Sequence, residues 1–149
     1  MPHLPVGPVH HMRMTVTDVE RSKAFYTDVL GFEVALDGPP PPEDDHHDEV
    51  LDSLQGGIIL THQGMFFGLR PADADRAAAG DRFDPLRVGL DHLSFGVPTR
   101  ADLDQAVALL DERGVEHGPI RDLTVVGASF LAFFDPDGIA LELSAPMSD

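Results

Sequence analysis

A pattern of strand, helix and three strands occurs twice along this chain, and it constrains the fold more than any other sequence feature. His11 and His92 stand at matched positions, each five residues before a valine near the end of a predicted strand. Each strand leads into a predicted helix that ends at a glycine, Gly31 or Gly114. A repeat of about 80 residues is too long for a solenoid unit, so it predicts two half-units related by an internal pseudo-twofold.

The first copy, residues 7–70, begins with apolar residues at alternate positions, which predicts a strand over 9–16. Asp18 then caps a helix that ends at Gly31. A proline-braced acidic loop is expected over residues 38–49. Further strands are expected over residues 32–37, 50–62 and 65–70.

The second copy, residues 89–146, contains the helix with the strongest signals, over 99–113, where Thr99 and Asp102 are spaced for mutual capping. Residues 71–88 lack strand alternation and are expected to be a linker with one helical turn. The strands of the second copy are expected over residues 89–97, 115–118, 125–134 and 139–144.

Composition excludes several function classes. The 149 residues include 26 acidic and 10 basic ones, giving a net charge of −16, which disfavours nucleic acid and anionic membranes as partners. The absence of cysteine excludes thiolate chemistry and zinc–thiolate sites, and the one lysine, Lys23, lies in a solvated helix start that does not suit Schiff-base chemistry. No apolar run spans a membrane and residues 1–11 lack signal-peptide features, so we expect one cytoplasmic domain built from both half-units.

Three ionisable side chains lie on the strand face opposite the apolar residues: His11, His92 and Glu142. If each half curls its strands into a concave sheet with the helix outside, all three point into one cavity. Burying them there without a partner costs several kcal/mol, and a divalent cation satisfies all three. Ligands of these types favour Fe²⁺ or Mn²⁺, with Ni²⁺ or Zn²⁺ as alternatives, and leave positions open for substrate or water.

The segments HHMRMTVTDVERSKAFYTDVLGFEV, DHLSFGV and FFDPDGIALELS resemble the vicinal oxygen chelate superfamily, which includes glyoxalases, bleomycin-resistance proteins and extradiol dioxygenases. The resemblance implies an α+β fold of two βαβββ modules that form a cup-shaped, partly closed mixed sheet with helices outside. It implies metal ligands at His11, His92 and Glu142. In glyoxalase I lyases the first module supplies a further carboxylate, where this chain has Gly68. This departure favours the three-ligand members, extradiol dioxygenases and fosfomycin-modifying thiol transferases.

Other polar residues have two interpretations each. His62 either serves as an acid or base at the cavity mouth or is an exposed strand-end residue. Arg13 either pairs with an anionic substrate group or forms an ion pair with a neighbouring strand. His10 lies off the strand parity and is expected to be packed or at the surface, while His46 and His47 are expected to be solvated or to bind metal adventitiously.

The leading hypothesis is a metal-dependent enzyme that binds a small substrate through neighbouring oxygens, with a dioxygenase-like reaction favoured. The alternatives are a glyoxalase-like lyase, isomerase or thiol transferase, and a non-catalytic protein that sequesters a drug or metabolite. A homodimer is expected because duplicated modules can pair through their strand edges.

Overall fold

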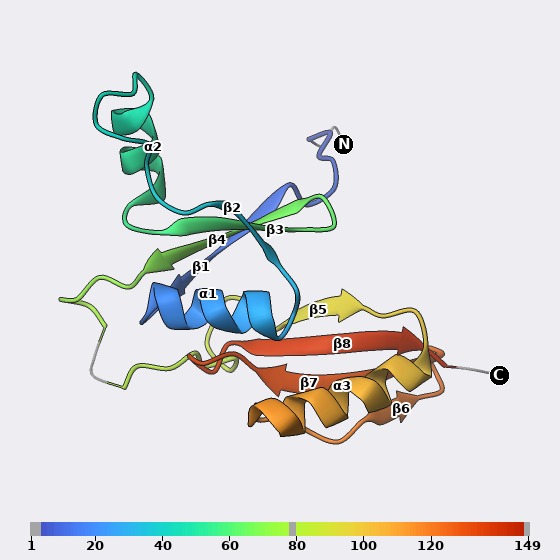
Figure 1. Cartoon of the computed structure of the whole chain (residues 1–149). Coiled ribbons are helices and arrows are strands. Elements are labelled where there is room, and N and C mark those ends of the chain that lie inside the picture. The colour runs from blue at the N-terminus through green and yellow to red at the C-terminus, as the bar shows by residue number, and fades with distance from the viewer. Residues whose placement is uncertain (1–3, 78–79, 148–149) are drawn as a thin grey trace. The chain divides into compact units, whose positions relative to one another are not determined.

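The computed structural model describes residues 4–77 and 80–147, and the chain divides into two compact units, residues 1–78 and 79–149 (Figure 1). The elements of the first unit are β1 (His11–Val16), α1 (Val19–Asp28), β2 (Glu33–Leu36), α2 (His47–Leu54), β3 (Ile58–His62) and β4 (Met65–Pro71). Those of the second are β5 (Leu93–Gly96), α3 (Arg100–Arg113), β6 (Arg121–Leu123), β7 (Ala128–Phe134) and β8 (Ala140–Pro146).

The two units share one sheet topology. The first sheet has the order β1-β4-β3-β2 and the second β5-β8-β7-β6. In each, the first strand runs parallel to the last, and the other neighbours are antiparallel. The predicted α+β class and the two βαβββ modules are therefore confirmed, with α2 inserted between β2 and β3 of the first module.

Capping and burial explain the two helices that the repeat predicts. The Asp18 side chain accepts a hydrogen bond from the backbone N–H of Arg21, and Thr99 and Asp102 cap α3 reciprocally. In the first unit, α1 packs on the sheet through Tyr26, which is fully buried and whose hydroxyl lies 3.4 Å from Met14 Sδ. In the second, α3 contacts β7 and β8 and buries Leu103 and Leu110. None of the helices in the described residues is long and apolar enough to cross a membrane.

The expected strand over residues 50–62 is wrong in its first half. Residues 47–54 form α2 instead, and Figure 1 shows this helix projecting away from the first sheet. Gln55 and Gly56 have left-handed backbones, which end the helix, and the chain reverses before β3 starts at Ile58. Gly57 has no room for a side chain, because a Cβ there would lie 2.0 Å from the Leu69 carbonyl oxygen.

The expected strand over residues 115–118 is reduced to one isolated bridge, between His117 and Phe133. The strand that pairs with β7 on this side is β6, three residues further along. In the linker, Asp73 accepts backbone hydrogen bonds from Arg76 and Ala77, which matches the single helical turn expected there; residues 78 and 79 lie outside the described residues.

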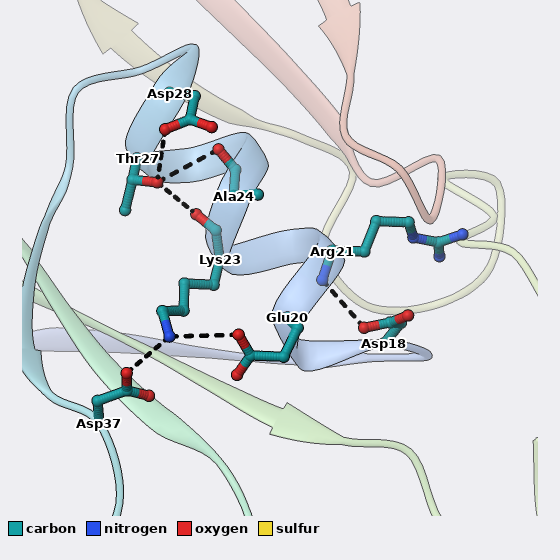
Figure 2. Close-up of polar contacts among 8 residues, drawn as sticks. All are labelled: Asp18, Glu20, Arg21, Lys23, Ala24, Thr27, Asp28 and Asp37. Carbon is teal, nitrogen blue, oxygen red and sulfur yellow. Dashed lines mark hydrogen bonds and ion pairs between the residues drawn. The ribbon is translucent and has the colours of Figure 1, made fainter.

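Lys23 joins α1 to the segment after β2. Its ammonium group lies 2.6 Å from an Asp37 carboxylate oxygen and 3.3 Å from a Glu20 carboxylate oxygen. Figure 2 marks both contacts with dashed lines. The hydrogen bond to Asp37, and then that to Glu20, raises the pKa of Lys23 above its ordinary value. A raised pKa favours the protonated form of Lys23, which does not suit the nucleophilic amine of Schiff-base chemistry.

Candidate metal centre

His92 and Glu142 come together within the second unit. His92 directly precedes β5, and Glu142 lies in β8 opposite Ser94 of β5. Leu141, next to Glu142, is buried, so alternation along β8 turns Glu142 to the other face, where its side chain is 20% exposed. His92 Nε2 lies 3.6 Å from Glu142 Oε1.

Asp91 determines which nitrogen of His92 is free. Its Oδ1 lies 2.5 Å from His92 Nδ1, so in the neutral ring Nδ1–H donates to Asp91 and Nε2 carries the lone pair. This hydrogen bond raises the pKa of His92, partial burial acts in the opposite direction, and the charge of Glu142 raises the pKa further. A carboxylate on the second ring nitrogen is the usual support of a metal-binding histidine.

The donor pair fits a divalent cation. Nε2 and Oε1 are both acceptors when the ring is neutral, and 3.6 Å is too long for a hydrogen bond between them. Two ligand atoms that each bind a metal at about 2.1 Å are separated by about 3.0–3.4 Å at tetrahedral or octahedral angles. A small closure of the two side chains would therefore let both bind one ion.

His11 occupies the matched position in the first unit and has a similar neighbour. The Nδ1 atoms of His10 and His11 lie 3.0 Å apart, and the two rings meet edge to face. The preceding side chain therefore engages Nδ1 in both repeats, His10 in the first and Asp91 in the second. If Nδ1 of His10 accepts a hydrogen bond from Nδ1–H of His11, the lone pair of His11 lies on Nε2.

The position matched to Glu142 in the first unit is Gly68, and the structure shows what takes its place. Gly68 pairs with Arg13 across β1 and β4, as Glu142 pairs with Ser94 across β5 and β8. A Cβ at Gly68 would lie 2.9 Å from Arg13 Cγ, so the arginine stem covers this position. Arg13 Nη2 donates to the carbonyl oxygen of Leu54, at a distance of 2.7 Å.

A cavity of about 270 Å³ lies in the first unit beside these residues. His11 and Arg13 line it together with apolar side chains from β3, β4 and the end of α2. One predicted ligand and the predicted substrate-binding arginine therefore share one concave surface.

His62 lies against the core instead. Its ring stacks on buried Phe32, with ring centroids 4.6 Å apart and an interplanar angle of 14°. His62 has the parity of buried Leu60 in β3, so it shares the face that carries Phe67 and α1. This position favours a packing role, and the catalytic role of His62 stays a prediction.

No group of three or more histidine and acidic side chains that could hold a metal is found in the part of the chain that the structure describes. His92 and Glu142 are brought together, while His11 belongs to the first unit. Sequence reasoning missed Asp91, although its place directly before a candidate ligand was a usable signal. It also missed the Leu54 carbonyl, because α2 was not expected.

The family model described as the glyoxalase/bleomycin resistance protein/dioxygenase superfamily matches residues 9–143. The uncharacterized protein YwkD of Bacillus subtilis is 36% identical over 91% of this chain and 94% of its own length. A glyoxylase/bleomycin resistance protein/dioxygenase domain from Frankia has a TM-score of 0.72 and 29% identity, covering 95% of this chain and 93% of its own.

The fosfomycin resistance protein FosX of Listeria monocytogenes, solved as a mutant with Mn(II) and a dihydroxypropylphosphonic acid, has a TM-score of 0.68. It is 16% identical, covering 95% of this chain and 93% of its own, and at that identity it supports the fold alone. The repeated topology and the family match over most of the chain lead to one conclusion: this protein belongs to the glyoxalase/bleomycin resistance protein/dioxygenase superfamily.

Proposed function

We propose that this protein is an enzyme that depends on a divalent metal ion held by His11, His92 and Glu142, and that it binds a small substrate through neighbouring oxygen atoms. The observation that carries the proposal is the pair of His92 Nε2 and Glu142 Oε1, 3.6 Å apart, with Asp91 on the other ring nitrogen. His11 joins the set because it holds the matched place in the repeat. Fe²⁺ or Mn²⁺ suits this ligand set best, with Ni²⁺ or Zn²⁺ as alternatives.

The bound ion would supply Lewis-acid stabilisation of negative charge on the substrate oxygens. The residues of the chain have separate tasks in this scheme. Asp91 and His10 hold the two imidazole rings in the orientation that leaves Nε2 free. Arg13 binds an anionic group of the substrate, for which its position in the wall of the cavity is the support.

Within this proposal we favour a dioxygenase-like reaction. Because Gly68 stands where the second module has Glu142, the first module has no carboxylate at this position to act as a fourth ligand or as a base. More positions then remain open for a bidentate substrate and dioxygen. The second candidate is a glyoxalase-like lyase, isomerase or thiol transferase, since the matched family model includes glyoxalases.

The metal proposal is tested by elemental analysis of the purified protein and by calorimetric titration of chelator-treated protein with Mn²⁺ and Fe²⁺, the latter without oxygen. We expect one ion per chain, and at least tenfold weaker binding in each of His11→Ala, His92→Ala and Glu142→Gln. His46→Ala, which removes an exposed histidine of the acidic segment, is the matched control and should bind as the parent does. Stoichiometric binding that survives all three ligand substitutions would overturn the site.

The reaction class is tested with an oxygen electrode. Iron-loaded protein with a panel of catechols should consume oxygen, and His92→Ala should not. Metal-dependent turnover of a thiol adduct without oxygen uptake would show the lyase class instead. Drug or metabolite binding that is unaffected by chelator, with no turnover of either kind, would show a sequestering protein.

We also propose that the protein is a cytoplasmic homodimer. Each four-stranded sheet has two edge strands, and unpaired edges offer backbone groups for association. Light scattering coupled to gel filtration should give about twice the chain mass of 16.1 kDa, and the mass of a single chain would contradict the dimer.

A further inference from the structure

Arg13 differs in its contact from Lys23 and Arg100, two cations of this acidic chain that form ion pairs. Lys23 contacts two carboxylates, and Arg100 contacts Asp104 and Asp122. Within the described residues, Arg13 donates its hydrogen bond to a neutral group, the Leu54 carbonyl oxygen. A guanidinium has five N–H donors, so most of its donors remain available.

Gly68 makes this placement of Arg13 sterically feasible. The arginine stem crosses β4 at the one position that has no side chain, and even a methyl group there would meet Cγ at 2.9 Å. The Leu54 carbonyl, at the end of α2, then holds the guanidinium by a 2.7 Å hydrogen bond. The glycine and the inserted helix together orient the cation, which lowers the entropy lost when a ligand binds.

The surroundings of Arg13 combine this charge with an apolar wall. The cavity of about 270 Å³ is lined by Leu54, Ile58, Ile59 and Phe66 as well as Arg13. Leu54 and Ile58 are buried, while Phe66 is 45% exposed. At about 30 Å³ for each water molecule, the space holds roughly nine waters, so it suits a ligand of about five to ten non-hydrogen atoms.

We propose that this cavity is a subsite for a small organic anion, whose carboxylate or phosphonate group binds Arg13 and whose short apolar chain contacts Ile59 and Phe66. The proposal deepens the proposed function and rests on it for the statement that the anion is the substrate. It specifies the substrate class as one that combines neighbouring oxygens with a negative charge at one end. Charge-assisted hydrogen bonds from a guanidinium to such a group are the strong ones.

The binding test uses chelator-treated protein, so that it does not depend on a metal. Butanoate and its neutral analogue butanamide are titrated separately, and ¹H–¹⁵N NMR spectra are recorded. We expect saturable shifts at residues of the cavity, with butanoate bound about tenfold more tightly than butanamide. Equal affinities for the two compounds, or shifts that do not saturate, would overturn the proposal.

Substitutions then locate the charge. Arg13→Met should abolish the preference for butanoate, and Arg13→Lys should retain part of it. Arg70→Met is the matched control. Arg70 lies on the same face of β4 as Gly68, which Arg13 covers, but it does not line the cavity. An equal loss in Arg70→Met would show a general effect of charge and overturn the assignment to this cavity.

Gly68→Glu provides a second route that leaves Arg13 in the chain. The new side chain displaces the arginine stem and places a carboxylate beside the guanidinium, so butanoate affinity should fall about tenfold. A variant that binds butanoate as the parent does would contradict the proposal. Far-UV circular dichroism of each variant confirms that it is folded.

Failure of this proposal can be told apart from failure of the proposed function. Arg13→Met should leave Mn²⁺ affinity within about twofold of the parent, and His92→Ala should leave the butanoate preference unchanged. If the parent protein binds no metal but still prefers butanoate to butanamide, only the enzyme proposal is overturned. Retained metal binding without butanoate preference would overturn the anion subsite alone.

Discussion

Asp91 is an exposed carboxylate that would support the proposed metal site through His92 rather than by binding the metal itself. Its side chain is 73% exposed, yet its Oδ1 is the hydrogen-bond partner of His92 Nδ1. Such a partner fixes the tautomer and makes the ligating nitrogen more basic. Asp91 is therefore a positioning residue in the proposed site.

We expect Asp91→Ala to weaken Mn²⁺ binding by about 10- to 100-fold, because the His92 ring loses the group that orients it. Calorimetric titration measures the effect. The same variant should lower the pKa of His92 towards its ordinary value, as followed by the ¹H NMR shift of the ring. Asp48→Ala, which removes an exposed carboxylate of α2, is the control, and equal losses in both variants would point to nonspecific electrostatics.

Strand parity predicted the orientation of Glu142 correctly, because apolar residues alternate with it along β8. The alternation of residues along a strand shows which face a side chain is on, but not which residues of other elements it contacts. His62 illustrates this point, since its contact with Phe32 depends on how the chain turns after α1. The contact of Arg13 with Leu54 was equally inaccessible, because it depends on a helix that the sequence pattern did not reveal.

At the scale of elements, capping explains which helices were predicted. Both α1 and α3 begin at residues whose side chains accept backbone hydrogen bonds, and such residues are readable in sequence. His46, before α2, makes no such hydrogen bond, and Val50, Leu51 and Leu54 resemble a continuation of the strand that follows. The two glycines at 56 and 57 were the available signal for a break.

The end of α3 is joined to the following segment by His117. Its Nδ1 lies 2.8 Å from the Gly118 carbonyl oxygen, and its Nε2 lies 3.1 Å from Asp111 Oδ1. The first of these contacts, followed by the second, raises the pKa of His117 above 6.5, while burial acts against them. Two acceptors around one ring favour the doubly protonated form.

This arrangement gives a pH-dependent contribution to stability. Because the folded-state pKa is raised, the contribution is fully present below the unfolded-state value of about 6.5 and is lost as the pH rises through the folded-state pKa. The free energy of unfolding in urea, compared between parent and His117→Gln, should therefore differ most below pH 6.5 and converge at higher pH. A difference that stays constant or grows with pH would contradict this role.

At the scale of the whole molecule, the duplication was predicted because both copies keep the same order of elements. The divergence between the copies is a matter of single positions: Arg13 and Gly68 stand in the first sheet where Ser94 and Glu142 stand in the second. The sequence alone identified the glycine as a departure. Only the backbone register and the side-chain contacts showed that the Arg13 stem covers this glycine while its guanidinium binds the Leu54 carbonyl oxygen.

The sheet order also has a consequence for synthesis on the ribosome. In each unit the strand made last, β4 or β8, is an inner strand that pairs on both sides. The first sheet can form once residue 71 has left the exit tunnel, but the second lacks an inner strand until residue 146 has been made. We expect stalled chains that expose residues 1–90 to resist brief proteolysis over the first unit, and those that expose residues 1–138 to be cleaved readily between β5 and β7.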